Sequence, residues 1–212
     1  MRHFILGVWI VAFAGTAMSL SAAEEQKKAP AKDTTEKAKT EKPKTIVIGA
    51  QAPAFKIKDV DGKLIDLAKL TAKGPVLVRL TCGCLGCDKE LAYFRSIHKS
   101  YEKLGLTSIA IFKEPDEKVR KYVKEKKLKM LYAVDTKGDS WKTFETKTMP
   151  TNFLIAKGGQ IKSIAAGCDP SGLVAKHLSL KVADLLNAKA VDPQKKVAAQ
   201  KTSTPDAKPK GK

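Results

Sequence analysis

The 212-residue sequence has little arginine and few aromatic residues. Aromatic residues make up 6% of the chain, and the arginines are Arg2, Arg79, Arg95 and Arg120. Lysine therefore carries most of the net charge of +18, and lysine lacks the forked hydrogen bonding with which arginine recognises phosphates and bases. No run of interleaved aromatic residues offers a stacking platform for nucleotides. These absences argue against specific nucleic-acid binding.

Long hydrophobic runs and abundant cysteine are missing as well. After the first twenty residues, no apolar run is long enough to cross a bilayer, which excludes a protein with several membrane spans. Four cysteines are too few for a small scaffold held together by disulfides. Hydrophobic residues nevertheless make up 43% of the chain, so the sequence predicts a globular domain with a packed core.

Residues 1–23 have the pattern of a secretory signal. A basic start and an apolar stretch precede the small residues Ser21 and Ala23, which suit cleavage before Glu24. An uncleaved anchor is the alternative, since residues 4–20 are long enough to span a bilayer if tilted. Both interpretations predict an exported protein of the periplasm or cell envelope.

Two Lys-rich segments flank the central part of the chain. Residues 24–44 contain seven Lys and five acidic residues without a large apolar side chain, which predicts a disordered linker. Residues 189–212 contain seven Lys and two Asp, and we expect a disordered tail there. Both segments predict weak association with an anionic envelope or membrane surface. Residues 45–188 remain, with 25 basic and 15 acidic residues and the size of one domain.

The apolar pattern of this domain alternates between strands and helices. Residues 75–80 form a nearly continuous apolar run, typical of a buried central strand. Apolar residues then recur every three or four positions over residues 91–104, as in an amphipathic helix. The Asp-Gly pair at 61–62 and the Gly-Gly pair at 158–159 predict two β-hairpins. We therefore expect an α/β sandwich around one mixed sheet.

Three of the four cysteines, Cys82, Cys84 and Cys87, stand within six residues. They follow the predicted central strand and open a helix, which is where ligands and chemistry gather in α/β sheets. The helix amino terminus stabilises a thiolate at Cys84, and Cys87 lies one turn further, close enough for a disulfide. We expect Cys84 to attack a partner's disulfide and Cys87 to resolve the mixed disulfide.

A non-catalytic binding module is the alternative, with the cysteines in a structural disulfide or a metal site. C-x-x-C is also half of a zinc site. However, the single residue between Cys82 and Cys84 strains zinc geometry, and His98 and His177 fit ordinary helix periodicity. We therefore predict no metal and no cofactor.

The order of these motifs resembles the AhpC/TSA–redoxin and TlpA-like branch of the thioredoxin superfamily. The matching segments are residues 48–55, 75–78, 84–90 and 149–151, within a resemblance that covers about residues 46–186. The resemblance implies a thioredoxin-like fold with an N-terminal β-hairpin extension. It also implies thiol–disulfide exchange with protein thiols and disulfides, and an upstream redox partner. Pro150 would be a cis-proline that shapes the substrate groove.

The sequence departs from this family near the cysteines. Gly83 stands where members usually have Trp, and residues 85–86 replace a frequent proline-containing pair, which leaves the redox potential and the direction of exchange open. A thiol peroxidase is the rival enzymatic function. Peroxiredoxins place Thr three residues before the peroxidatic cysteine, as Thr81 stands before Cys84, but Leu77 replaces their Pro.

Cys168 and Glu90 are further candidates for the site, and Arg79 is a buried charge that needs an explanation. Cys168 follows the last predicted strand at the sheet edge where Cys84 lies, so it is either a second resolving thiol for Cys82 or an isolated thiol. Glu90 is a candidate for proton transfer or an ordinary helix-surface carboxylate. Arg79 lies in a buried strand and needs a carboxylate partner that the sequence does not identify.

Overall fold

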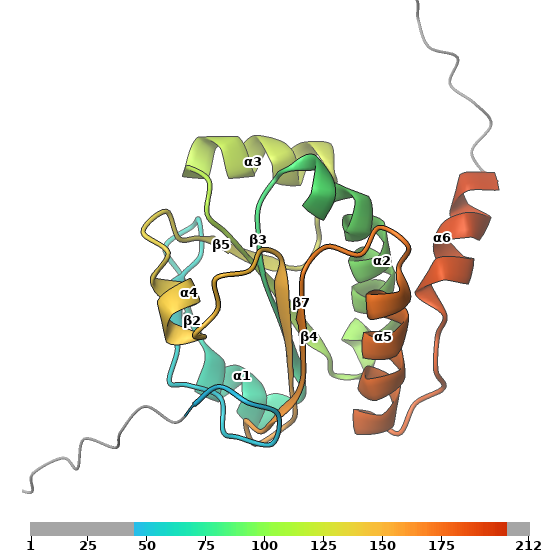
Figure 1. The fold of residues 1–212 in the computed structure, drawn as a ribbon, viewed down its shortest axis with the longest axis horizontal. Helices are drawn as coiled ribbons and strands as arrows, with labels where there is room; N and C mark the ends of the chain where they lie inside the picture. Colours follow the sequence, from blue (N-terminus) through green and yellow to red (C-terminus); the bar gives the residue numbers. More distant parts are fainter. Residues whose placement is uncertain (1–44, 203–212) are drawn as a thin grey trace, which may run out of the picture. The chain divides into compact units, whose positions relative to one another are not determined.

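The computed structural model describes residues 45–202 of the chain (Figure 1). The predicted signal at residues 1–23 and the predicted linker at residues 24–44 lie outside the described residues. Among residues 45–202, no helix combines the length and the hydrophobicity that a membrane crossing needs.

Strands and helices alternate along the described chain. The elements are β1 (Lys56–Lys58), β2 (Leu64–Asp66), α1 (Leu67–Lys73), β3 (Val76–Thr81), α2 (Leu85–Tyr101), the short 3₁₀ helix η1 (Glu102–Leu104), β4 (Thr107–Phe112), α3 (Asp116–Glu125), β5 (Leu131–Val134), α4 (Asp139–Thr143), β6 (Thr151–Ile155), β7 (Ile161–Ala166), α5 (Leu173–Leu185) and α6 (Pro193–Thr202). Both predicted hairpins form: β1 pairs with β2, and β6 pairs with β7.

Five strands form one mixed sheet in the order β5-β4-β3-β6-β7. Strands β5, β4 and β3 are parallel, whereas β6 runs antiparallel to both β3 and β7. Strand β7 therefore runs in the same direction as β3, and the two strands end at the same edge of the sheet. The separate β1–β2 hairpin precedes the sheet in the chain. The predicted α/β fold with a mixed sheet and an N-terminal hairpin is confirmed.

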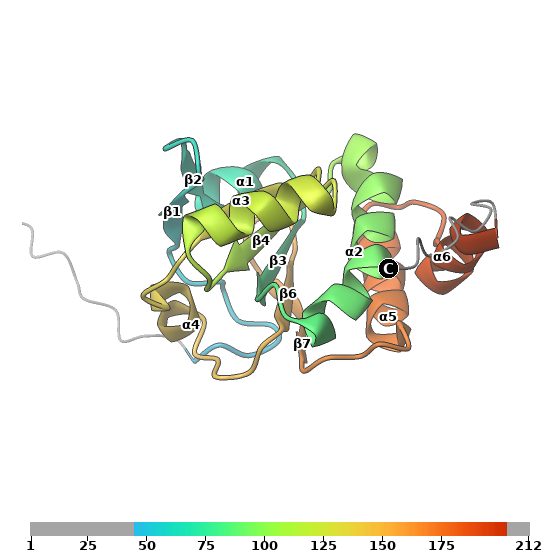
Figure 2. The ribbon, with the colours of Figure 1, turned by 90° about the horizontal axis from the view of Figure 1, so that it is seen from above.

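The apolar run of β3 is buried on both faces because helices cover both sides of the sheet. Val76, Val78 and Leu80 belong to a core with α1, α4 and the hairpin. Leu77 points to the opposite face and packs with α2 and α5. Figures 1 and 2 show α2 and α5 on one side of the sheet and α1 and α4 on the other.

The strand registers place the cysteine loop beside Pro150. Leu80 pairs with Thr151 across the β3–β6 ladder, so the residues after β3 lie next to the residues before β6. The peptide bond between Met149 and Pro150 is cis, as the family resemblance implies. The end of β3 thus brings the cysteine loop and this proline to one edge of the sheet.

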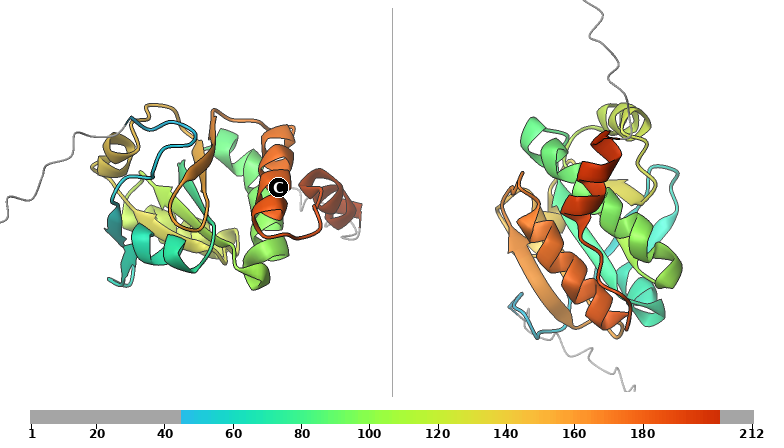
Figure 3. Two further views of the ribbon diagram at one scale, coloured as in Figure 1. Left: turned by 90° about the horizontal axis from the view of Figure 1, so that it is seen from below. Right: turned by 90° about the vertical axis from the view of Figure 1, so that its right-hand side faces the viewer.

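Helix α6 corrects the prediction of a disordered tail at residues 189–212 for the part from Pro193 to Thr202. The carboxylate of Asp192 accepts hydrogen bonds from two N–H groups of the first turn, at 2.9 and 3.3 Å, and Pro193 occupies the first helical position. Val197 is buried, and α6 contacts both α2 and α5 (Figure 3). Alanine, lysine and glutamine have a high helix propensity. The Asp192 cap and the buried Val197 side chain therefore suffice to stabilise a helix in this segment. Residues 203–212 lie outside the described part.

Removing the cap tests how α6 is held. We expect Asp192→Ala to destabilise α6 by about 1 kcal/mol, since the variant loses the cap and the ion pair of Asp192 with Lys176. Amide hydrogen exchange of the full chain should become faster in α6 but not in the central strands. Asp184→Ala, an exposed aspartate in α5, is the matched control. Equal α6 protection in both variants would contradict this account.

Candidate functional site

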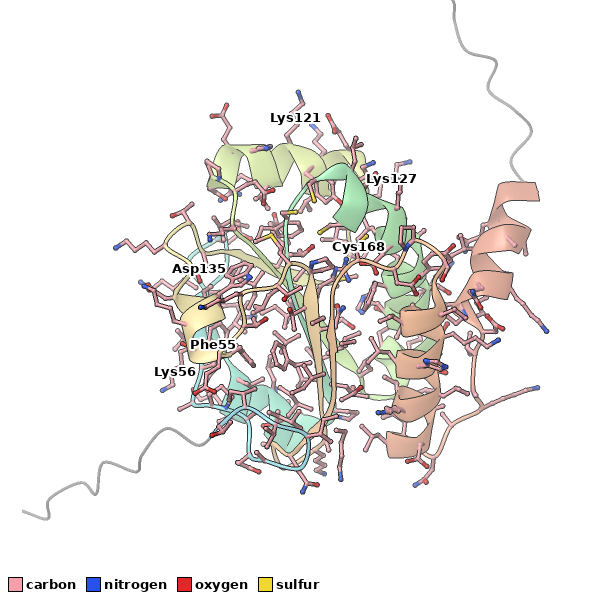
Figure 4. All side chains as sticks on the ribbon, viewed as in Figure 1. Phe55, Lys56, Lys121, Lys127, Asp135 and Cys168 are labelled. Atoms are coloured by element: carbon pink, nitrogen blue, oxygen red, sulfur yellow. The ribbon has the colours of Figure 1, made fainter. Side chains whose placement is uncertain are left out.

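The four cysteines lie in segments that meet at one edge of the sheet, after β3, at the start of α2 and after β7. Figure 4 labels Cys168 at this edge. Cys82 lies in the loop after β3, Cys84 precedes the first residue of α2, Cys87 lies in its first turn, and Cys168 follows β7. Cys84 and Cys168 are exposed, Cys82 is half-buried and Cys87 is buried, and all four are free thiols. The nucleophile predicted for disulfide exchange is therefore accessible, and the predicted resolving thiol is not.

Three of these sulfur atoms form a compact cluster. The Sγ atoms of Cys82, Cys84 and Cys87 all lie within 4.8 Å of one another, and those of Cys82 and Cys87 are 3.3 Å apart. The one-residue spacing between Cys82 and Cys84 thus does not separate their sulfurs, contrary to the argument made against a metal site. A structural zinc site normally takes four ligands, and this cluster offers three from the described residues.

Cys168 approaches the same loop from β7. Its Sγ donates a hydrogen bond to the carbonyl oxygen of Gly86 at 3.0 Å. A Cβ atom at Gly86 would lie 3.5 Å from this sulfur, an ordinary van der Waals distance, so the contact does not depend on glycine. The shared sheet edge predicted for Cys168 and Cys84 is present. Cys82, however, contacts Cys84 and Cys87, while Cys168 lies against Gly86.

The surroundings of Cys84 favour its thiolate. A hydrogen bond with the Cys82 thiol makes the largest contribution to lowering the pKa of Cys84, followed by the backbone N–H of Cys87 and, more weakly, that of Gly86. These N–H groups belong to the unpaired first turn of α2, which also favours negative charge. Burial instead raises the pKa of Cys82, which keeps that thiol protonated and able to donate. Cys84 is therefore an exposed thiol whose surroundings stabilise its deprotonated form.

Helix α3 fixes the loop and the start of α2. The Glu114 carboxylate accepts a hydrogen bond from the backbone N–H of Gly83 at 2.7 Å. Asp88 accepts from the Tyr122 hydroxyl at 3.0 Å and pairs with Lys126 at 2.7 Å. The sequence pattern did not single out these residues for the site, because mixed charges on a helix ordinarily mark a solvated face. They hold the cysteine loop from outside the motif.

The carboxylate partner of Arg79 is Glu90. The Nη2 atom of Arg79 lies 2.7 Å from Oε2 of Glu90, and the two side chains are 3% and 1% exposed. Arg79 also donates to Asn152 at 3.0 Å and stacks on Phe94, 4.1 Å from the ring centroid. The other oxygen of Glu90 accepts from the backbone N–H of Asp169. Glu90 is therefore not a helix-surface carboxylate, and the buried pair is fully hydrogen-bonded, as charge in a core requires.

Thr81 and Pro150 border the cluster with different roles. Thr81 is buried, and its hydroxyl donates to the carbonyl oxygen of Cys82 at 3.4 Å. The Thr81 hydroxyl is therefore engaged by the backbone of its own loop. Pro150 is buried too, and its carbonyl oxygen accepts from the N–H of Gly167 at 2.8 Å, which ties it to the end of β7.

A cavity of about 540 Å³ opens beside the residue that precedes Pro150. Its lining combines an apolar part with several lysines and consists of Lys113, Lys137, Gly138, Trp141, Lys142, Glu145, Thr146, Lys147 and Met149. The ammonium group of Lys113 lies 5.8 Å from the ring centroid of Trp141. The cavity is thus apolar at Trp141 and Met149 and positively charged at its lysines.

Removing the Cys82 thiol tests the activation of Cys84. We expect Cys82→Ala to raise the pKa of Cys84, because the thiolate loses its main hydrogen-bond donor. Alkylation of Cys84 by iodoacetamide should become about tenfold slower near pH 7, and its pH midpoint should move upward. Mass spectrometry of Cys84 gives the rate at each pH, and Cys168→Ala serves as the control. An unchanged midpoint in Cys82→Ala would refute the assigned cause.

Removing one member of the buried ion pair should destabilise the fold strongly. We expect Arg79→Met and Glu90→Leu each to lower the free energy of unfolding by about 3–5 kcal/mol, since each leaves a buried charge unpaired. The double variant should lose much less than the sum. Urea unfolding of the full chain measures all three. Asp139→Ala, which breaks an exposed pair with Lys142, should have little effect. Additive losses would show that the two groups do not interact.

Comparisons with known proteins agree with this geometry. The sequence profile of the AhpC/TSA family matches residues 48–164. The thiol-disulfide oxidoreductase ResA of Bacillus thuringiensis subsp. konkukian is 35% identical over 121 residues, which cover 57% of this chain and 70% of ResA. ResA of Bacillus subtilis is 26% identical over 137 residues, or 64% of this chain and 76% of that protein.

A solved structure shares the fold. The putative thiol:disulfide interchange protein DsbE from Chlorobium tepidum superposes with a TM-score of 0.61 at 21% identity, over 66% of this chain and 99% of that one. This likeness shows a thioredoxin-like fold. Together with the ResA match and the neighbouring cysteines of the C-x-x-C pair, it shows that the chain belongs to the AhpC/TSA family and is a thiol-disulfide oxidoreductase.

Proposed function

We propose that the protein exchanges disulfides with partner proteins outside the cytoplasm, with Cys84 as the nucleophile and Cys87 as the resolving thiol. One observation carries this assignment: an exposed thiol with a lowered pKa stands at a helix amino terminus, in the same sulfur cluster as a buried thiol. A nucleophile must meet a protein substrate, whereas a resolving thiol needs only to meet the nucleophile.

The proposed exchange takes place in two steps. The Cys84 thiolate attacks one sulfur of the partner's disulfide, and the partner's other sulfur leaves as a thiolate. Cys87 then loses its proton and attacks Cys84, which releases the reduced partner and leaves a Cys84–Cys87 disulfide. An upstream dithiol of another protein returns the pair to the reduced state by the same chemistry. The opposite direction, in which the protein oxidises its partners, uses the same steps in reverse.

Glu90 supports this chemistry by position. Both of its carboxylate oxygens are occupied, one by Arg79 and the other by the N–H of Asp169. We therefore assign Glu90 as a positioning residue, which ties the first turns of α2 to β3 and to the loop after β7. Solvent or a neighbouring thiolate accepts the proton that Cys87 releases.

Location outside the cytoplasm rests on the signal-like pattern of residues 1–23 and on the similarity to ResA. An oxidising or envelope compartment is also where protein disulfides are common substrates. Attachment to an anionic surface through the Lys-rich segments 24–44 and 189–212 belongs to the same proposal.

A thiol peroxidase has less support from the site. The Thr81 hydroxyl, which would mark a peroxidatic centre, donates to the backbone of Cys82, and Leu77 stands where the peroxidase pattern needs Pro.

Two serine variants test the proposed roles. We expect Cys84→Ser to reduce the rate of insulin disulfide reduction to the uncatalysed background, because the attacking thiolate is gone. Cys87→Ser should instead accumulate a mixed disulfide between Cys84 and the substrate, visible by mass spectrometry without reductant. Cys168→Ser should retain activity. Peroxide consumption that depends on Cys84, without insulin reduction, would support the peroxidase and contradict disulfide exchange.

We further propose that partner segments enter the cavity beside Met149 and carry negative charge. The lining supports this, since Lys113, Lys137 and Lys147 border an apolar base near the cis-proline. Opposite charge raises the rate of encounter, and it does so less at high salt.

Charge reversal at the cavity tests the choice of partner. We expect Lys137→Glu/Lys147→Glu to lower kcat/KM about tenfold for a disulfide peptide with acidic flanks, and to raise it for one with basic flanks. Lys69→Glu/Lys73→Glu makes the same change of net charge on α1 and should leave both rates nearly unchanged. Equal effects of the two double variants would mean that overall charge, and not this cavity, selects the partner.

A further inference from the structure

Cys87 has two thiols within reach. The Sγ atom of Cys82 lies only 3.3 Å from that of Cys87, and both belong to the cluster that includes Cys84. A disulfide bond is about 2.05 Å long, so an approach of about 1.3 Å would join Cys82 and Cys87. Cys82 lies in the loop between β3 and α2, outside both regular elements.

We propose that Cys82 is a third redox-active thiol, which replaces Cys84 as the disulfide partner of Cys87. The inference rests on the proposed function, in which the Cys84–Cys87 disulfide forms first. It gives a role in disulfide exchange to Cys82, which the reaction of Cys84 and Cys87 alone does not require.

The exchange is an isomerisation without net oxidation. Cys82 loses its proton, and its sulfur attacks the Cys87 sulfur of the Cys84–Cys87 disulfide. The bond between the sulfurs of Cys84 and Cys87 breaks, the bond between those of Cys82 and Cys87 forms, and Cys84 leaves as a thiolate. One disulfide is present before and after the step, and the proton that leaves Cys82 passes to solvent or to Cys84. No external oxidant or reductant is consumed.

The environment of the three sulfurs favours the new isomer. The better leaving group is the thiolate that the protein stabilises most. The hydrogen bond from the Cys82 thiol is lost in the new isomer, but the backbone N–H groups of Cys87 and Gly86 in the first turn of α2 still stabilise the Cys84 thiolate. Cys82 is half-buried and Cys87 is buried, so a bond between them lies in the interior of the site. Cys84 is exposed, so the isomerisation returns it to solvent.

This isomer would give the oxidised protein a property that a two-cysteine site lacks. Its disulfide is sheltered, and its nucleophile remains free to form a mixed disulfide with a further partner. An oxidised protein could then act on partner disulfides by rearrangement as well as by electron transfer. A variant without Cys82 would lose this second state but keep the first.

Differential labelling of the full chain tests the proposal. The reduced protein, held with a chelator so that no metal occupies the thiols, is oxidised in a glutathione buffer until about half of the molecules carry one disulfide. Acid quenches the exchange, a light alkylating reagent labels the free thiols, and a heavy one labels the others after reduction. Trypsin releases residues 80–89 as one peptide, because Arg79 precedes it and Lys89 ends it. Fragment ions then assign each label to Cys82, Cys84 or Cys87.

The expected result is a major species with a light label on Cys84 and heavy labels on Cys82 and Cys87. Cys84→Ser should form the same Cys82–Cys87 disulfide, and Cys168→Ser should give the wild-type pattern. If Cys82 carries the light label in all singly oxidised wild-type molecules while Cys84 and Cys87 are heavy, Cys82 is not redox-active and the inference fails, although the proposed function stands. If no disulfide forms within this peptide at any buffer ratio, both fail.

Discussion

The buried ion pair between Arg79 and Glu90 is the interaction on which the site depends. It joins β3 to α2, the two elements that flank the cysteine loop, at a distance of 2.7 Å. Arg79 extends the link to Asn152 in β6, and Glu90 extends it to the backbone of Asp169 after β7. The segments that carry the cysteines and the strand that follows Pro150 are therefore all linked to the Arg79–Glu90 ion pair by hydrogen bonds. Because unpaired charges are very costly in a core, the pair holds these segments in a single arrangement.

The thiols of the cluster differ in their exposure to solvent and in their protonation. The amino terminus of α2 and the Cys82 thiol stabilise the Cys84 thiolate, which is exposed, whereas burial keeps the proton on Cys82. The same loop is held by Glu114 from the side of α3. In the proposed exchange, Cys84 forms the thiolate and meets the partner, whereas Cys87 resolves the mixed disulfide; their sulfur atoms lie within 4.8 Å of each other. A thiol–disulfide oxidoreductase needs this division, since a fully exposed pair would react as readily with small thiols as with its partners.

The sequence predicted those features that local pattern determines. The apolar run of β3 predicts the central strand, and the periodicity of α2 predicts the helix that follows it. The position of Cys84 between this strand and this helix follows from the two patterns. The features that it missed depend on contacts between residues far apart in the chain. The pattern of α2 does not distinguish Glu90 from a surface residue, because its partner Arg79 lies on β3. Glu114 lies just before α3, among mixed charges that are typical of a solvated surface. Helix α6 was missed because its docking relies on Val197 amid lysines and alanines, a composition that disorder and a capped helix share.

The central claim is that the cysteine cluster holds a reversible dithiol–disulfide couple that requires Cys87, and a redox titration tests it most directly. The full chain is equilibrated in a series of glutathione buffers, and the free thiols are counted after an acid quench. The account predicts a single two-electron transition that is reached from both the oxidised and the reduced side, and that disappears in Cys87→Ser. Four thiols that remain free across the whole series, or oxidation that cannot be reversed, would contradict it.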